Sequence, residues 1–404
     1  MSIDSVETFL TILQRMQVLN AQEAQDVARE LGPHFTDPHD LAHYLTEIGW
    51  LTAYQVRLLF SDRWEELKIG PYHILDRLGE GGVSEVFKAW DNAKGRIVAL
   101  KVLHQHLSNR SAAVRELQRE QLAVMRLSHP NIIRIFDANH IGDVSYFAME
   151  FIEGIDLEGY VRRCGPLPIE EACEYVRQVA QGLEFAHQVG LVHRDIKPAN
   201  LFLAIPGGLR EGETLTARRA AETMVKILDW GLARVRPDAL PLSPPDSGWH
   251  GKMNPADVDL DTEKGMLIGT ADYIAPEQAR DPCLVDIRSD IYSLGCTLYY
   301  LLAGLPPFQG GSLMQKLLQH QEAERPNLRQ VRPEVPEELA AIVQRMMARQ
   351  PEERYAIPLL VSAALRPFTP AAKRPGSSPM IARPKKPSTA AINISAIRAR
   401  TRDA

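Results

Sequence analysis

Hydrophobic positions in the first sixty residues recur three or four residues apart, the spacing of helices with one buried face. Helix-start signals accompany them. Asp37 precedes a proline at the start of one apolar segment, and Thr52 and Gln55 form a capping box before the last. We therefore expect residues 1–66 to form a small all-helical module. These positions predict packing and helix ends, and they indicate no chemistry.

From Tyr72 the period changes to that of strands. Segments rich in β-branched and aromatic residues, bounded by Gly-containing turns, are expected to be strands. They are HILDRLG, EVFKAWD, RIVALKVL and YFAMEFI. Helical spacing occupies Ala113–Leu127 and dominates after the last of these strands, as far as about Leu365. A strand-rich part followed by a helix-rich part predicts two lobes.

The composition is that of a protein with an ordinary core. Of the 404 residues, 45% are hydrophobic and 24% are charged, which excludes a wholly disordered chain or a fibrous rod. Four cysteines without CxxC spacing exclude a disulfide scaffold. The acidic first residues do not resemble a signal peptide, and the longest apolar stretch is too short to span a bilayer. We expect a cytoplasmic protein.

The charge is distributed unevenly. The net charge is −5, yet residues 366–404 hold nine Lys or Arg and a single acid, Asp403. This Pro- and Ser-rich stretch lacks periodic apolar residues, so we expect residues 369–404 to form a basic disordered tail. A role of the tail in nucleic-acid binding is an alternative. It is the weaker one, because no aromatic residue follows Phe368.

A glycine-rich turn between two predicted strands is the first candidate for chemistry. Gly79, Gly81 and Gly82 allow backbone N–H groups to approach phosphate oxygens, although such a turn by itself is more often only a hairpin. Lys101 then lies inside an apolar strand, where an unpaired ammonium is costly. It needs anionic partners, and Glu120 on the next predicted helix is the natural carboxylate.

Two further motifs supply oxygen ligands and a base. In HRDIKPAN, Asp195 and Asn200 are spaced so that one can accept a hydroxyl proton while the other binds a metal. Asp229, followed by Trp230 and a glycine, supplies a second hard oxygen ligand. The segment that begins at Asp229 ends with the triplet Ala-Pro-Glu, whose last residue is Glu277.

In this order and register, the motifs resemble those of the eukaryotic-type serine/threonine protein kinases, especially their bacterial branch, from Tyr72 to Phe368. The resemblance implies an α+β fold with two lobes in residues 67–368. The small lobe, about 71–152, would be an antiparallel β-sheet, and the large lobe, about 153–368, would be mostly helical. The small all-α module would precede them.

The resemblance also implies an activity: transfer of the γ-phosphoryl group of ATP to Ser or Thr hydroxyls of proteins, with Mg²⁺ or Mn²⁺. Asp195 would accept the hydroxyl proton, Lys197 would steady the γ-phosphate, and Thr270 would complete the floor of the site. The implied catalytic residues are Lys101, Glu120, Asp195, Lys197, Asn200 and Thr270. Those implied to bind ATP are Leu78, Gly79, Glu80, Gly81, Gly82, Val86, Ala99, Lys101, Met149, Glu150, Ile152, Phe202 and Asp229. The implied metal ligands are Asn200 and Asp229.

Supporting residues follow from the same resemblance. Asp290 is expected to be a buried carboxylate that orients the backbone of the His-Arg-Asp motif, and Arg354 is expected to pair with Glu277. Thr262 is expected to be the principal autophosphorylation site, because Arg194 beside the catalytic aspartate needs an anionic partner.

Some features depart from the family pattern. Ser84 replaces the third glycine of the loop, Trp230 replaces phenylalanine, and residues 204–222 form an insertion. They leave open a second hypothesis, a pseudokinase that acts as a binding scaffold, although every catalytic residue is present. The helical module is either a packing extension of the small lobe or a partner-binding unit, and we favour the second slightly.

Overall fold

The computed structural model describes residues 3–19, 21–81, 84–103, 125, 127–142, 144–209, 223–230, 234–235, 271–281 and 285–370. They fall into two compact units. The first contains the described residues up to 103 together with 139–151, and the second contains those within 125–138 and 152–370.

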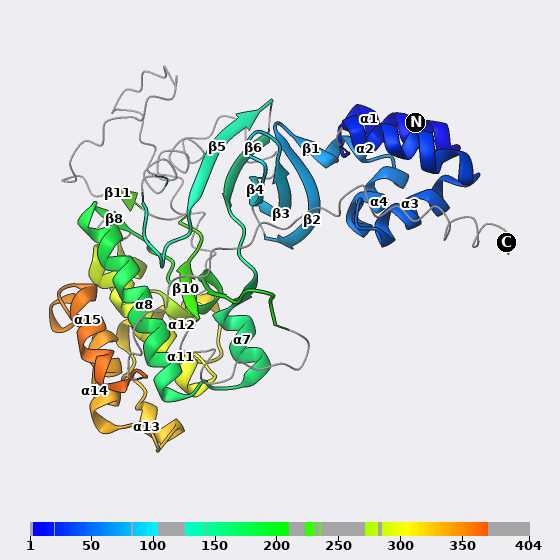
Figure 1. Cartoon of the computed structure of the whole chain (residues 1–404). Coiled ribbons are helices and arrows are strands. Elements are labelled where there is room, and N and C mark those ends of the chain that lie inside the picture. The colour runs from blue at the N-terminus through cyan, green and yellow to red at the C-terminus, as the bar shows by residue number, and fades with distance from the viewer. Residues whose placement is uncertain are drawn as a thin grey trace, which may run out of the picture. The chain divides into compact units, whose positions relative to one another are not determined.

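The described residues up to Leu67 are mostly helical, as their apolar spacing predicts (Figure 1). The predicted helix starts are confirmed: Asp37 accepts a hydrogen bond from the His39 N–H at 2.7 Å, and Thr52 and Gln55 form a complete capping box. The elements are α1 (Val6–Met16), α2 (Ala21–Asp26), the π-helical η1 (Val27–Leu31), η2 (Gly32–His34), α3 (Pro38–Glu47), α4 (Ala53–Phe60) and η3 (Trp64–Leu67). Their apolar faces enclose one hydrophobic core.

Six of the described strands form one sheet in the order β1-β2-β3-β4-β6-β5 (Figure 1). They are β1 (Lys68–Ile69), β2 (Tyr72–Glu80), β3 (Ser84–Asp91), β4 (Arg96–Leu103), β5 (Ile135–Ile141) and β6 (Val144–Glu150). The four predicted strands coincide with β2, β3, β4 and β6. The sequence pattern does not predict β5, because Asp137, Asn139 and His140 interrupt its apolar alternation.

The two faces of this sheet carry different side chains. Phe87, Leu100 and Ala148 are register partners across β3, β4 and β6, and all three are buried. Lys101 follows Leu100 in β4 and therefore points to the opposite face, since successive side chains in a strand alternate. The first face belongs to a hydrophobic core, and the second carries Lys101 beside the buried side chains of Ala99 and Phe147.

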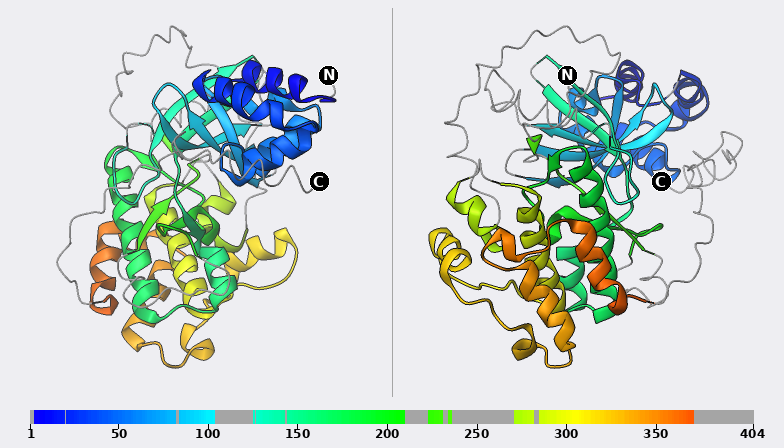
Figure 2. Two further views of the ribbon diagram at one scale, coloured as in Figure 1. Left: turned by 45° about the vertical axis from the view of Figure 1, so that its right-hand side comes forward. Right: turned by 90° about the vertical axis from the view of Figure 1, so that its left-hand side faces the viewer.

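The second unit is mostly helical. Its helices are α7 (Leu157–Cys164), α8 (Ile169–Gln188), α10 (Pro276–Arg280), α11 (Ile287–Ala303), α12 (Leu313–Glu322), α13 (Leu328–Val331), α14 (Glu337–Met346) and α15 (Pro358–Leu365), with short turns η4 (Pro198–Asn200), η6 (Ala271–Tyr273), η8 (Pro351–Glu353) and η9 (Arg366–Phe368). The long helices α8 and α11 pack against each other at its centre (Figure 2). Gly295 permits the close crossing of α11 and α14, because a Cβ there would lie 2.8 Å from the Met346 Cβ.

Short strands, which the sequence pattern does not predict, cross the second unit. A three-stranded sheet has the order β10-β9-β7, and a two-stranded one pairs β11 with β8. The strands are β7 (Gly154–Asp156), β8 (Leu191–Val192), β9 (Leu201–Ala204), β10 (Met224–Ile227) and β11 (Arg234–Val235). Each is only two to four residues long, which is too short to show a period.

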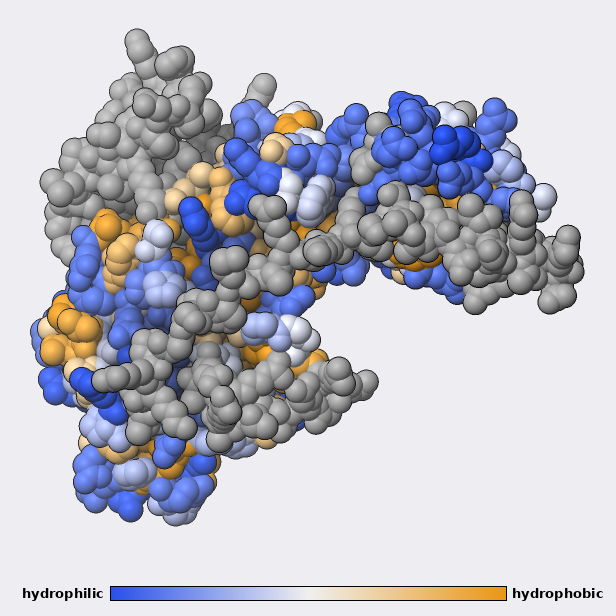
Figure 3. Space-filling model, in the orientation of Figure 1, coloured by the Kyte–Doolittle hydropathy of each residue, from blue (hydrophilic) through white to orange (hydrophobic). Residues whose placement is uncertain are grey.

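Large exposed apolar side chains are unevenly distributed. On α12, Leu313, Met314 and Leu318 are exposed, whereas no large hydrophobic side chain described between residues 3 and 67 reaches that exposure. Figure 3 accordingly shows a mainly hydrophilic surface on the visible face of the helical module. Within the described ranges, no helix is both long enough and apolar enough to cross a membrane.

Candidate active site

Strand pairing in the second unit brings the two predicted metal ligands together. β9 and β10 are antiparallel, with Leu201 opposite Ile227, so Asn200 and Leu228 are adjacent at one end of the pair. The Leu228 N–H donates to the Asn200 carbonyl at 2.8 Å. Asp229 is the next residue. Two segments that are distant in sequence therefore deliver an amide and a carboxylate to the same strand ends.

The carboxylate of Asp195 is held by two side chains from its own loop. Lys197 Nζ lies 2.8 Å from Asp195 Oδ2, and Asn200 Nδ2 donates to the same oxygen at 2.9 Å and to the Asp195 carbonyl at 2.7 Å. Both side-chain contacts are on Oδ2. Among the described residues, Oδ1 is left to accept a proton from an incoming hydroxyl.

His193 connects this loop to the segment that precedes Asp229. Its Nδ1 accepts the Asp195 N–H at 3.2 Å, so the proton is on Nε2, which lies 2.9 Å from the Leu228 carbonyl. The Trp230 ring packs edge-on against the imidazole at a centroid distance of 4.7 Å. Trp230 is 1% exposed, and its indole N–H has no hydrogen-bond partner among the described residues.

Asp290 on α11 orients the backbone of the loop, as predicted. Its Oδ2 accepts the His193 N–H and its Oδ1 accepts the Arg194 N–H, each at 2.8 Å. Complete burial raises the pKa of Asp290, although the two N–H donors and the nearby charges of His193 and Arg194 oppose that rise. Arg194 and Asp229 both have a positive φ, 68° and 52°. Such backbone strain persists where the surroundings impose it, and it is frequent at active sites.

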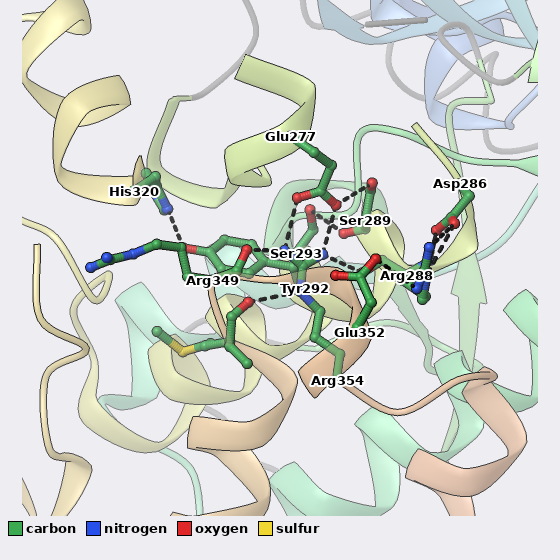
Figure 4. Close-up of polar contacts among 12 residues, drawn as sticks. Glu277, Asp286, Arg288, Ser289, Tyr292, Ser293, His320, Arg349, Glu352 and Arg354 are labelled. Carbon is green, nitrogen blue, oxygen red and sulfur yellow. Dashed lines mark hydrogen bonds and ion pairs between the residues drawn. The ribbon is translucent and has the colours of Figure 1, made fainter. Parts of the chain in front are cut away.

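The predicted pair of Glu277 and Arg354 is present and bidentate (Figure 4). The two guanidinium–carboxylate distances are 2.6 and 2.8 Å, and Ser289 Oγ donates to Glu277 Oε1 at 2.6 Å. The Arg354 side chain is fully buried. Burial by itself would raise the pKa of Glu277, but the hydrogen bonds and charge of Arg354 lower it below its usual value.

Gln278 is a site residue that the sequence analysis missed. Its Nε2 donates to the Arg194 carbonyl at 2.8 Å, so the helix that begins at Pro276 contacts the loop that carries Asp195 and also, through Glu277, Arg354. Its position beside Glu277 is the only sequence signal that points to it.

A buried histidine lies in the same helical packing. His320 Nδ1 is 2.7 Å from the Tyr292 hydroxyl, and Figure 4 shows the pair. Burial lowers the pKa of His320 to about 4, and the charges of Arg325 and Lys316 act in the same direction. The ring is therefore neutral in the folded protein at neutral pH, and its Nδ1 accepts a hydrogen bond from the Tyr292 hydroxyl.

We expect His320 to make stability depend on pH. Between about pH 6.5 and 4, this histidine is protonated in the unfolded chain, where its pKa is about 6.5, but neutral in the folded one. Its contribution to the free energy of unfolding is therefore complete above about pH 6.5 and decreases as the pH falls towards 4. The loss attributable to this residue is about 3 kcal/mol. Urea unfolding of the unaltered protein and of His320→Gln between pH 7 and 4 measures it. Equal pH slopes for both proteins would contradict the prediction, and His43→Gln, at an exposed histidine, serves as the control.

Four of the predicted ATP-binding residues of the first unit, Val86, Ala99, Lys101 and Met149, share one face of the six-stranded sheet. Val86 on β3 is the register partner of both Gly79 and Lys101, and Ala99 is the partner of Met149. Because Ala99 and Lys101 are two residues apart in β4, all these side chains point to the same side. Glu150 pairs with Val98 and ends β6.

The turn that would cover a phosphate is shaped by its glycines. The Gly81 N–H donates to the Ser84 carbonyl at 2.8 Å, and a Cβ built on Gly79 would meet no atom of the described residues within 4 Å. Leu78 and Glu80 are exposed beside it. Open space over glycine backbone suits a phosphate chain, so the turn fits ATP.

The remaining predicted residues lie elsewhere or outside the described ranges. Ile152 and Phe202 belong to the second unit, where Phe202 in β9 pairs with Asp156 and Lys226. The residues outside the description are Gly82, Glu120, Thr262, Thr270 and most of the 204–222 insertion and the 369–404 tail. The donor set that is described fits a hard divalent cation: Asn200 keeps its Oδ1, and Asp229 supplies a carboxylate from the neighbouring strand end.

The protein kinase domain model matches residues 72–365, nearly three quarters of the chain. Among curated proteins, the serine/threonine-protein kinase PknB of Mycobacterium leprae is 35% identical over 288 residues, covering 70% of this chain and 40% of that protein. PknB of Mycobacterium tuberculosis is 36% identical over 296 residues, and PrkC of Bacillus subtilis is 32% identical over 286 residues. The two alignments cover 70% and 71% of this chain, and 42% and 38% of the respective relatives.

The chain thus spans about two fifths of the length of these relatives. In structure it is similar to the kinase domain of Mycobacterium tuberculosis PknI, with a TM-score of 0.54 and 24% identity, covering 75% of this chain and 98% of that one. This similarity confirms the predicted fold class. From the matched domain and the identity to these relatives, the chain belongs to the protein kinase family.

Proposed function

We propose that the protein is an ATP-dependent serine/threonine protein kinase that also phosphorylates itself. The observation that carries this proposal is the arrangement around Asp195: Lys197 and Asn200 hold one of its oxygens, beside the strand ends that present Asp229. The relatives named serine/threonine-protein kinases support the choice of hydroxyl substrate.

Asp195 orients the substrate hydroxyl and takes its proton as the oxygen bonds to the γ-phosphorus and the bond to the β-phosphate oxygen breaks. Lys197, 2.8 Å from Asp195, steadies the charge on the transferred group. Thr270 completes the floor beneath it. Asp290 and His193 keep this loop in place, so positioning supplies much of the rate enhancement.

Lys101, with Glu120 as its partner, holds the α- and β-phosphates, and the turn from Leu78 to Gly82 covers them. The adenine lies among Val86, Ala99, Met149 and Phe202, and Glu150–Ile152 bind its edge through their backbone. Asn200 and Asp229 hold Mg²⁺, with Mn²⁺ as a substitute. The metal would neutralise charge on the phosphate oxygens.

The domain division follows the same proposal. Residues 1–66 form a helical module, 67–368 the kinase domain and 369–404 a basic tail that tethers or contacts acidic surfaces. The partners are ATP and protein substrates with Ser or Thr, with a protein that binds the module as one of the two alternatives for its role, and we expect no specific nucleic-acid binding. Because ATP is held inside the cell, we assign the reaction to the cytoplasm.

Incubation of the purified protein with labelled ATP and Mg²⁺, followed by phosphoamino-acid analysis, tests the function. We expect phosphoserine and phosphothreonine, with Thr262 as the main activating site, and loss of labelling when Mg²⁺ is chelated. Dominant phosphotyrosine would refute the substrate class. Nucleotide binding without transfer to the protein or to a generic substrate would favour the scaffold hypothesis.

A further inference from the structure

The helical module continues into the sheet without a linker. Trp64 and Leu67 of η3 are buried in the hydrophobic core of the module, and β1 begins at the next residue, Lys68. β1 then pairs with β2 through Lys68 with His73 and Ile69 with Tyr72. The core of the module therefore ends where the sheet begins.

Strand β2 needs support beyond its first residues. β1 pairs with it only as far as His73, so from Ile74 onward β2 is an outer edge among the described strands. Its pairing with β3 is also irregular, with register shifts between Ile74 and Asp76 and between Arg77 and Gly79. An irregular edge strand leaves backbone groups available to other partners.

The module supplies those partners from the start of α4. Thr52 Oγ1 donates to the Leu75 carbonyl at 2.5 Å, and Gln55 Nε2 donates to the Ile74 carbonyl at 2.8 Å. Gln55 is 2% exposed, so its hydrogen bond is shielded from water.

The same two side chains also complete the capping box: the Gln55 N–H donates to Thr52 Oγ1, and the Thr52 N–H donates to Gln55 Oε1. Every polar side-chain group of both residues is therefore used. The residues that begin the helix also hold the edge of the sheet.

An aromatic contact joins the same surfaces. The Tyr54 ring lies 6.3 Å from the Phe87 ring, tilted by 56°. Phe87 is buried on β3 beside Val86, the register partner of Gly79. Burial, together with Glu66 and Glu85, raises the pKa of Tyr54.

We propose that Thr52 and Gln55 are positioning residues for nucleotide binding. By fixing the carbonyls of Ile74 and Leu75, they fix the part of β2 that leads into the Leu78–Gly81 turn, and so the height of that turn over the phosphates. This inference rests on the proposed function. It assigns the module a role inside the kinase that does not depend on an outside partner, and the lack of large exposed apolar side chains in its described residues agrees with that role.

Point variants in the full-length chain test the inference. Gln55→Met and Thr52→Val remove the donors to β2, together with the two side-chain acceptors of the capping box. Thr52→Ser retains the hydroxyl, and Thr46→Val removes a hydroxyl whose partner among the described residues is the Ala42 carbonyl inside α3. We expect KM for ATP, and the dissociation constant of a fluorescent ATP analogue, to rise about 3–10-fold in the first two variants, which is the size of the one hydrogen bond to β2 that each of them loses. kcat should change less than about twofold, and Thr52→Ser and Thr46→Val should match the unaltered protein.

Amide hydrogen exchange separates positioning from general destabilisation. Faster exchange in residues 76–80, with α11 unchanged, is expected for Gln55→Met and Thr52→Val. Unchanged KM and analogue affinity in both variants would overturn the inference, and so would equally faster exchange throughout the chain. Failure of the proposed function would look different. The unaltered protein would then transfer no phosphate, while the dissociation constant of the ATP analogue would still show whether the two variants disturb the turn after β2.

Discussion

Asp195→Ala is expected to lower kcat for phosphoryl transfer by about 10²–10⁴-fold while ATP affinity stays within about threefold of that of the unaltered protein. The carboxylate is the proposed acceptor of the hydroxyl proton, and its Oδ2 is held by Lys197 at 2.8 Å and by Asn200 at 2.9 Å. Removing it leaves the hydroxyl without a base or an orienting group. Steady-state kinetics with saturating ATP and titration of a fluorescent ATP analogue measure the two effects separately.

The matched control for this variant is Glu158→Ala. Glu158 forms a surface ion pair with Arg162 on α7 at 3.5 Å, so its loss should change neither turnover nor affinity. Turnover of Asp195→Ala close to that of the control would remove Asp195 from the mechanism. A parallel loss of analogue affinity would instead indicate that the loop has collapsed.

Arg354→Ala is expected to destabilise the second unit by about 3–5 kcal/mol, because it leaves the buried carboxylate of Glu277 without its partner. The guanidinium also donates to the backbone carbonyls of Ala348, Arg288 and Arg349, so several acceptors lose their donors at once. Urea unfolding at pH 7 measures the change.

Two comparisons make this prediction specific. Arg329→Ala breaks an exposed ion pair with Glu337 at 3.4 Å and should cost less than about 1 kcal/mol. The double variant Arg354→Met with Glu277→Leu should recover part of the loss, since no buried charge then remains unpaired. If Arg354→Ala were no more destabilising than Arg329→Ala, the buried pair would not hold α10 to the rest of the unit.

The pair also makes an acid-sensitive contribution. The pKa of Glu277 is below its ordinary value in the folded protein, so the stabilisation is present above that ordinary value and is lost as the pH falls through the folded one. Arg354→Ala should therefore weaken the acid dependence of unfolding as well as the stability at neutral pH.

Local features were predictable from the sequence. The capping box of Thr52 and Gln55 depends on residues three positions apart, and β2, β3, β4 and β6 each carry enough apolar or β-branched residues to show their period. β5 was missed because polar residues interrupt it, and β7 to β11 because they are too short. Their pairing partners, and not their own sequences, make them strands.

In the candidate site, the residues that could carry chemistry were identifiable from local motifs. Asp195, Lys197 and Asn200 lie within one short motif, so their mutual contacts follow from their spacing along the chain. The contacts that hold this motif come from residues far away in the sequence. Gln278, 84 residues from Arg194, reaches a backbone carbonyl that no local pattern identifies. Asp290, 97 residues from His193, was expected only from the resemblance to the kinase family, since nothing in its own neighbourhood in sequence indicates its partners.

The same distinction applies to the helical module. Its apolar spacing and helix caps are local and were read from the sequence, but the second use of Thr52 and Gln55 as donors to β2 was not. A capping box has the same sequence whether its spare donors face water or a strand. These donors bond to a strand only where that strand has carbonyls without a partner in the sheet. Such carbonyls are found only in the folded chain, where buried polar groups are hydrogen-bonded between segments distant in sequence.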